Sequence, residues 1–212
     1  MKVIFIILLL IIAGGIITMV KIEQKNKPVN EEHTLSKGDV ISVGNIKVTL
    51  TQISVHRLEI NPETGLGGDE LQADLKVTYG KESKTLFLIS RTGFSSMKTW
   101  KEHTFSLDGG DYNKVTLIVS KVELGKEFAL TEEDSVLIDN LSIKVNKIVN
   151  IMAQDKNETW NISKRHVNLS LIKDNKEETI SIYEGKSAQW NDYTIQFLRV
   201  DDSGAIIKVD KN

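Results

Sequence analysis

Apolar and polar residues alternate with a period of two along most of the chain after residue 35. Such alternation places apolar side chains on one face of a β-strand, whereas a helix would repeat them every 3.6 residues. Turn-forming residues separate the runs at Gly44-Asn45, Asn61-Pro62, Gly80-Lys81 and residues 108–111. No segment after the N-terminal region carries an amphipathic helical pattern. The pattern therefore predicts an all-β protein, and its alternating apolar positions include Ile46-Val48-Leu50, Leu75-Val77-Tyr79, Val115-Leu117-Val119, Leu141-Ile143-Val145, Val167-Leu169-Leu171 and Ile207-Val209.

The alternating pattern occurs twice in the same order. Residues 35–53 align without a gap on residues 130–148, and WKEHTFSL from Trp100 aligns with WNDYTIQF from Trp190. Repeated blocks in one order indicate an internal duplication. We therefore expect two tandem, duplicated small β-sandwich or β-barrel domains, over residues 35–122 and 130–212. Chance agreement between two all-β patterns is the alternative at this level of identity.

The N-terminal region has a different pattern. Eighteen residues from Val3 to Val20 carry no charge, and a helix of that length rises about 27 Å, close to the thickness of the hydrocarbon core of a bilayer. We expect residues 1–21 to form an uncleaved membrane anchor that crosses the bilayer through residues 3–20. A cleaved signal peptide is the alternative, although its apolar region is usually shorter. The polar residues 22–34, which contain Pro28, are expected to form a stalk.

The orientation of this anchor is predicted from two opposing signals. Lys21, Lys25 and Lys27 follow the apolar segment, so the distribution of positive charge does not favour a cytoplasmic N-terminus. A chain without cysteine and with a single N-terminal apolar segment favours export of the residues that follow it. We expect a single-pass membrane protein with an extracytoplasmic body.

Composition and charge exclude several classes of protein. The chain has 212 residues and no cysteine, which excludes disulfides, thiolate metal sites and cysteine nucleophiles. The formal net charge is −2, so the basic surface that duplex nucleic-acid binding requires is missing. Residues 35–121 carry a net charge of +1 and residues 130–212 one of −3. We expect no nucleic-acid partner and no cofactor.

Catalytic motifs are also missing from the sequence, which has no nucleophile elbow, no paired-histidine zinc motif and no phosphate loop. Two acidic loops supply the remaining candidates, Asp69 and Glu70 in one and Asp108 and Asp111 in the other. Such oxygen ligands on glycine-containing loops suit Ca²⁺, but neither loop has the spacing of a calcium-binding loop. Solvated hairpin turns are the simpler interpretation.

The tryptophans supply one further candidate. Trp100 and Trp190 occupy equivalent places in the two copies, where buried aromatic residues at the corners of the sheets explain them. Trp160 has no counterpart in the first copy and lies in a loop of the second. It is therefore the candidate platform for a carbohydrate or protein ligand. Four triplets, at Asn140, Asn157, Asn161 and Asn168, have the form of glycan acceptors in a eukaryotic secretory path, and chance occurrence in a chain rich in Asn, Ser and Thr is the alternative.

Two functional hypotheses follow. The first is a membrane-anchored, extracytoplasmic, non-enzymatic binding or scaffold protein whose β domains contact a protein partner in the cell envelope. The second is a metal-dependent or carbohydrate-active enzyme whose site gathers Asp69, Glu70, Asp108, Asp111 and His103. The first requires exposed loops or sheet edges, and the second requires these side chains to converge.

Overall fold

The computed structural model describes residues 26–27, 31–59, 68–91, 94–154 and 160–212. These residues form an all-β structure of four sheets, and they contain no helix. All strand pairs are antiparallel except the short pair between β1 and β3. Within the described part of the chain, no helix is long and apolar enough to cross a bilayer. The segment from Val3 to Val20, predicted above to be an anchor, lies outside the described residues.

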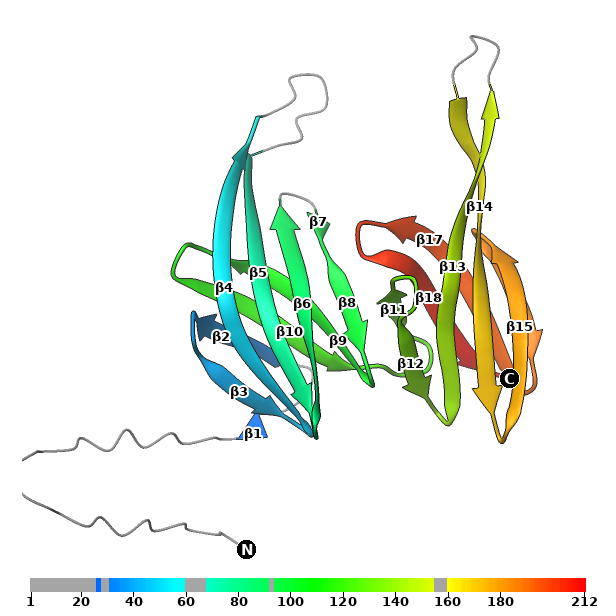
Figure 1. Ribbon diagram of the computed structural model, residues 1–212, viewed down its shortest axis with the longest axis horizontal. Helices are drawn as coiled ribbons and strands as arrows, with labels where there is room; N and C mark the ends of the chain where they lie inside the picture. Colours follow the sequence, from blue (N-terminus) through cyan, green and yellow to red (C-terminus); the bar gives the residue numbers. More distant parts are fainter. Residues whose placement is uncertain (1–25, 28–30, 60–67, 92–93, 155–159) are drawn as a thin grey trace, which may run out of the picture.

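Two sheets form the first half of the molecule (Figure 1). One has the order β1-β3-β4-β5-β6-β7, and the other has the order β2-β10-β9-β8. Their strands are β1 Asn26–Lys27, β2 Glu31–Ser36, β3 Val40–Val43, β4 Ile46–Leu58, β5 Gly68–Tyr79, β6 Glu82–Arg91, β7 Phe94–Ser95, β8 Met97–Trp100, β9 His103–Gly110 and β10 Lys114–Lys121.

Two four-stranded sheets form the second half, with the orders β12-β13-β14-β15 and β11-β18-β17-β16. Their strands are β11 Glu127–Leu130, β12 Ser135–Ile138, β13 Leu141–Gln154, β14 Trp160–Lys173, β15 Lys176–Tyr183, β16 Lys186–Trp190, β17 Tyr193–Asp201 and β18 Gly204–Lys211. Apart from β1 and β7, each strand of the first half has a counterpart at the same place in the strand order of the second.

The halves also share their irregularities. The register between β4 and β5 shifts after Leu50, and the register between β13 and β14 shifts after the aligned Val145. A second shift leaves one unpaired residue in β9 and one at the aligned position of β17, Asp108 and Leu198. Three backbone hydrogen bonds also recur at aligned positions. Gly38 N donates to Leu50 O at 2.8 Å, as Glu133 N does to Val145 O at 2.7 Å, and Leu50 N donates to Asp39 O at 3.1 Å, as Val145 N does to Asp134 O at 3.0 Å. Val122 N donates to Glu102 O at 2.8 Å, as Asn212 N does to Asp192 O at 2.9 Å.

Each half has its own hydrophobic core between its two sheets. The alternating positions of the sequence supply both cores, because every second side chain of a strand points to the same face. Leu50, Leu75 and Leu117 are fully buried in the first half, as Val145, Leu169 and Ile207 are in the second. The predicted alternation and the all-β class are confirmed.

The first half begins earlier in the chain than the sequence indicates. Residues 31–34, expected in the stalk, belong to β2, which pairs with β10 along its whole length. His33 and Leu35 are both buried on the same face of β2. The alternation of buried positions therefore begins at His33, two residues before Leu35, but the sequence does not show this because histidine is polar. At the other end of the expected first domain, Val122 packs in the second core, as does the neighbouring Leu124.

One predicted turn also lies elsewhere. Residues 108–111 were expected to form a turn, but Asp108, Gly109 and Gly110 continue strand β9. The chain reverses over residues 111–113, where Asp111 N donates to Lys114 O at 2.8 Å. The two glycines therefore extend the strand beyond its bulge, with φ values of 143° and 153°.

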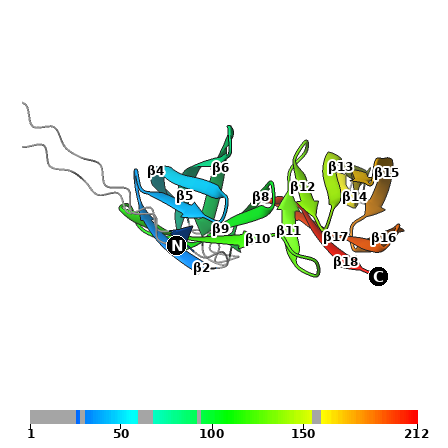
Figure 2. The same ribbon diagram turned by 90° about the horizontal axis from the view of Figure 1, so that it is seen from below.

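The two halves lie end to end, with β8 of the first half near β11 of the second (Figure 2). Lys84 pairs with Asp134 across this junction, and the guanidinium of Arg91 lies 3.0 Å from the carboxylate of Asp202. The backbone N–H of Met97 donates to Ser203 Oγ at 2.7 Å. Such contacts fix the arrangement of the halves without merging their cores.

Candidate functional site

The longest hairpin of each half extends beyond the sheets, and both extend toward the same side of the molecule (Figure 1). The hairpin of β13 and β14 carries three apolar side chains near its end. Ile151, Met152 and Ile162 expose 37%, 47% and 44% of their surface. A group of exposed aliphatic side chains on one protruding ribbon differs from the single apolar residues scattered over most protein surfaces.

A β-bulge lies directly below this apolar end. Ile151 pairs with Lys164 and Met152 with Ile162, so Ser163 is an additional residue in β14. Its hydroxyl donates to the carbonyl of Ile151 at 3.0 Å. The paired residues of β4 and β5 follow one register from Gln52 to Leu58, without a second bulge. Because a bulge changes the direction of neighbouring side chains, this end of the second hairpin is built differently from the first.

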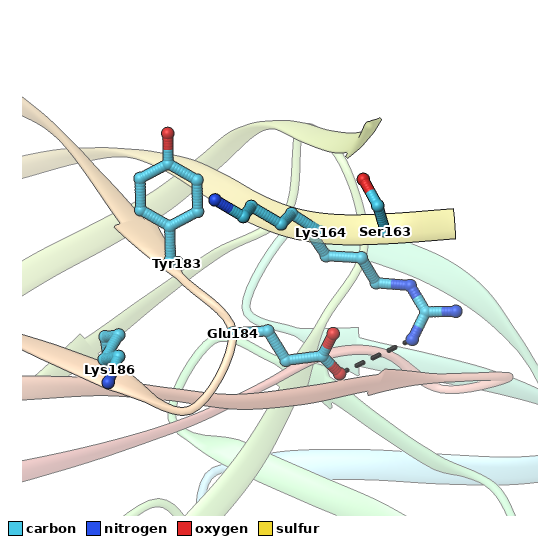
Figure 3. Close-up of a pocket in the computed structure, with 6 residues that line it drawn as sticks. Ser163, Lys164, Tyr183, Glu184 and Lys186 are labelled. Carbon is cyan, nitrogen blue, oxygen red and sulfur yellow. Dashed lines mark hydrogen bonds and ion pairs between the residues drawn. The ribbon is translucent and has the colours of Figure 1, made fainter. Parts of the chain in front are cut away.

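The edge of β14 is open beside the bulge. β15 pairs with β14 only from His166 to Lys173, and the last contact is a hydrogen bond from Glu184 N to Arg165 O at 3.0 Å. Beyond that point, in the described part of the chain, residues 160–164 pair only with β13. A pocket of about 450 Å³ lies along this edge (Figure 3) and is lined by Ser163, Lys164, Arg165, Tyr183, Glu184 and Lys186.

The pocket carries an excess of positive charge. The Arg165 guanidinium lies 3.4 Å from the Glu184 carboxylate and also donates to Asn150 Oδ1 at 3.2 Å. Glu184 is held further by the backbone N–H of Val200, at 3.3 Å. Among the described residues, neither Lys164 nor Lys186 forms an ion pair with a carboxylate. One carboxylate is therefore neutralised, and two ammonium groups remain available to an anionic ligand.

Tyr183 forms one wall of the pocket. Half of its surface is exposed, and its ring centroid lies 5.5 Å from that of His166. Figure 3 shows Lys164 extending toward Tyr183 above the turn that carries Glu184. The pocket thus combines an aromatic surface, two unpaired cations and a free strand edge.

Two of the acidic residues predicted from the sequence line a different pocket. Asp69 and Asp111 lie on a cavity of about 270 Å³ in the first half, together with Arg91 and Tyr112. Asp111 also accepts hydrogen bonds from the backbone N–H groups of Asn113 and Lys114, at 2.8 and 3.1 Å. These bonds lower the pKa of its carboxyl group and assign it a structural role in the turn between β9 and β10.

The other predicted acidic residues do not join this cavity. Glu70 lies 3.7 Å from the guanidinium of Arg91, and Asp108 is the exposed bulge residue of β9. His103 is buried at the opposite end of β9, about 16 Å away along the strand. The described part of the chain holds no cluster of three residues able to bind a metal ion.

The structure describes the side chains of Trp100 and Trp190 but not that of Trp160. Trp190 is buried, and its indole N–H donates to Glu178 Oε2 at 2.7 Å; Trp100 packs against the first core. These positions confirm the interpretation as buried or corner residues. Trp160 was expected in a loop, but its backbone begins β14 opposite Gln154; its side chain lies outside the described residues.

Sequence reasoning missed the pocket beside β14. Lys164, Tyr183 and Lys186 come from three strands, β14, β15 and β16, and their proximity depends on where β15 leaves β14. The available signals were the basic run Lys164-Arg165 and the break in alternation at Ile151-Met152. Neither signal identifies a pocket without the strand pairing.

No family model matches this chain, and no curated protein matches its sequence. Its function is therefore inferred from the residues and contacts described above.

Proposed function

We propose that the chain is a membrane-anchored, extracytoplasmic, non-enzymatic binding or scaffold protein. Residues 3–20 anchor it, and its two duplicated β domains present the β13–β14 hairpin to a protein partner in the cell envelope. The observation that carries the proposal is the exposed apolar end of this hairpin, formed by Ile151, Met152 and Ile162.

The shared framework of the halves supports the duplication. Their strand order, two register shifts and three backbone hydrogen bonds recur at aligned positions. Chance agreement of alternating patterns would reproduce buried positions but not bulges at the same residues, because a bulge depends on local register.

The position of β1 supports the proposed direction of the hairpins. β1 lies at the end of the first half opposite the end toward which β4 and β5 extend (Figure 1). A chain anchored before β1 would approach its first domain from that opposite side. The hairpin ends would then face away from the bilayer and toward an envelope partner.

The apolar residues at the end of the hairpin are better explained by a partner than by folding. β13 and β14 form a two-stranded ribbon there, and such ribbons are only marginally stable by themselves. Exposed apolar residues on a free strand edge invite association with other chains, and folded proteins usually protect such edges with charges or a short strand. A partner that buries Met152 and Ile162 would remove this exposure.

Crosslinking in intact cells tests the proposal. A membrane-impermeant crosslinker should join the full chain to a partner, and the double variant Met152→Ser/Ile162→Ser should lose this product. Ile172→Ser is the matched control, because Ile172 lies on the same strand with 41% of its surface exposed, but far from the hairpin end. We expect the control to crosslink as the unmodified chain does.

Two outcomes would contradict the proposal. An unchanged product in Met152→Ser/Ile162→Ser would show that the hairpin end does not contact the partner. A product that forms only after permeabilisation would place the body on the cytoplasmic side.

A further inference from the structure

We propose that the pocket beside β14 binds an extended acidic segment of the partner, which pairs as an additional strand with β14. This inference rests on the proposed function and names the kind of segment that is recognised. The carboxylates of the segment would face Lys164 and Lys186, and its backbone would continue the sheet where β15 leaves it.

The backbone of β14 has an open edge beside the pocket. After the bond from Glu184 to Arg165, β15 turns away, and residues 160–164 of β14 have no strand on that side within the described chain. Unpaired N–H and C=O groups on a strand edge can be satisfied by an incoming strand. The pocket occupies the position that such a strand would take, because it is lined by β14 on one side and by the turn after β15 on the other.

The charged side chains that line the pocket favour an acidic ligand. Lys164 and Lys186 line the pocket from different strands, one on β14 and one at the start of β16. The Glu184 carboxylate is already bound by Arg165 and by Val200 N, so it cannot neutralise both ammonium groups as well. An acidic segment supplies the complementary charge, and complementary charge raises the association rate and selects the partner.

The shape of the pocket favours a peptide over a lipid surface. A bilayer needs cations spread over a flat or convex face, whereas these two cations flank a recess at a strand edge. The bulge at Ser163 changes the direction of the side chains beside that edge. Tyr183, half exposed, offers an apolar and aromatic surface to alternate side chains of a bound strand.

Binding of a defined peptide to the full chain in detergent tests the inference. The probe is a fluorescent, terminally blocked peptide in which glutamate alternates with valine. We expect saturable binding that weakens as the salt concentration rises from about 0.05 to 0.5 M, because screening reduces the attraction. Two comparison probes are the same peptide with lysine in place of glutamate and the same peptide with proline in place of valine. Neither should bind, because the first repels the pocket and the second lacks every other backbone N–H, which prevents regular pairing as a strand.

Charge-reversal variants locate the binding site. Lys164→Glu/Lys186→Glu should weaken binding of the glutamate peptide by about tenfold or more, since two favourable charge interactions become repulsive. Lys176→Glu is the matched control, because it makes the same charge change at an exposed position at the other end of the β14–β15 pair. We expect this control to bind the peptide with unchanged affinity.

The outcomes separate this inference from the proposed function. Suppose that Met152→Ser/Ile162→Ser abolishes crosslinking in cells while Lys164→Glu/Lys186→Glu affects neither crosslinking nor peptide binding. The proposed function then stands, and the acidic strand is excluded. Unchanged crosslinking in both variants would overturn both. Binding of phosphatidylglycerol vesicles through Lys164 and Lys186, without peptide binding, would assign the cations to a lipid surface and overturn the inference.

Discussion

The two halves share one framework and differ at the ends of their long hairpins. In the first half, Glu70 lies near Arg91, and β7 adds a further strand beside β6. In the second half Lys164 stands at the position aligned with Glu70, and no strand covers the edge of β14 beside it in the described chain. The same sheet order therefore carries a carboxylate beside an arginine in one half and an unpaired lysine at the aligned position of the other. Both edges are open in the described chain, because residues 68–70 of β5 pair only with β4, as residues 160–164 of β14 pair only with β13.

This difference shows which contacts a duplicated β fold can change at little cost. The repeated hydrogen bonds and bulges lie near the cores, where a shift of register would move every apolar side chain to the wrong face. The hairpin ends lie beyond the cores, so their residues can change without disturbing the packing. Function is therefore expected where the two halves depart from each other.

A second difference lies at an aligned buried position, between His103 and Tyr193. The Tyr193 hydroxyl donates to the carbonyl of Asp139 at 2.6 Å, and Lys173 Nζ lies 4.5 Å from the centre of its ring. Among the described residues, no group forms a hydrogen bond with His103 Nδ1, and burial lowers the pKa of this histidine. The second half thus satisfies a polar group that the first half leaves unsatisfied.

The largest predicted effect tests whether the two cores are independent. Leu75 and Leu169 are aligned and fully buried, so Leu75→Ala and Leu169→Ala should each cost about 2–5 kcal/mol in the half that carries the change. Hydrogen exchange of the full chain should show faster exchange in that half alone. Faster exchange across both halves from either variant would mean one indivisible unit.

An intermediate effect tests the junction. Asp39 and Asp134 are aligned and accept hydrogen bonds from Ser36 N at 2.8 Å and Thr131 N at 3.3 Å, but Asp134 also pairs with Lys84 across the junction. Asp39→Ala should cost about 1 kcal/mol, and Asp134→Ala about 1–3 kcal/mol, measured by denaturant unfolding. Asp134 also accepts a hydrogen bond from the Thr131 hydroxyl, so Lys84→Met, which removes the ion pair alone, should account for the part of the excess that comes from the junction. Equal losses of unfolding free energy in the two aspartate variants would show that the junction does not contribute to stability.

The smallest effect concerns pH. Burial lowers the pKa of His103, against the weaker opposing influence of Glu102, so the unfolded chain takes up a proton more readily than the folded one. Stability should therefore fall as pH drops below the ordinary value of 6.5, and the loss should level off below the lowered pKa. His103→Tyr, which copies Tyr193, and His103→Gln should both flatten this part of the curve.

Unfolding at a series of pH values measures this difference. The carboxyl groups of Asp111, Asp139 and Asp192 have lowered pKa values for other reasons, and their contribution is lost only as pH falls below 3.8. The two ranges are therefore separate. An unchanged slope between about pH 7 and 5 in both His103 variants would contradict the assignment to His103.

The strands and buried positions of both halves could be predicted from the sequence, because alternation within each single strand determines them. Alternation places Val48, Leu50 and Leu117 on one face of each strand wherever the strands pair, and the structure buries all three. The alignment of Trp100 with Trp190 also indicated equivalent places in the two halves. Polar residues concealed the start of β2, since His33 is buried there despite its ring nitrogens.

The candidate pocket could not be predicted because its cause is not local. Lys164 and Lys186 come together only because β15 ends at Tyr183 and the chain crosses to the other sheet. The grouping of Asp69 with Asp111 likewise depends on packing between strands of two sheets. Residue types suggested acidic loops, but sheet geometry decided which charges share a surface.

The polar junction between the halves has a mechanical consequence. Tension applied to the β13–β14 hairpin and resisted at β1 must cross the contacts of Lys84, Arg91 and Met97 before it reaches the first core. Exposed ion pairs yield at lower cost than buried apolar cores. The junction should therefore open first and let the two halves change their relative orientation, while both β bodies keep their folds.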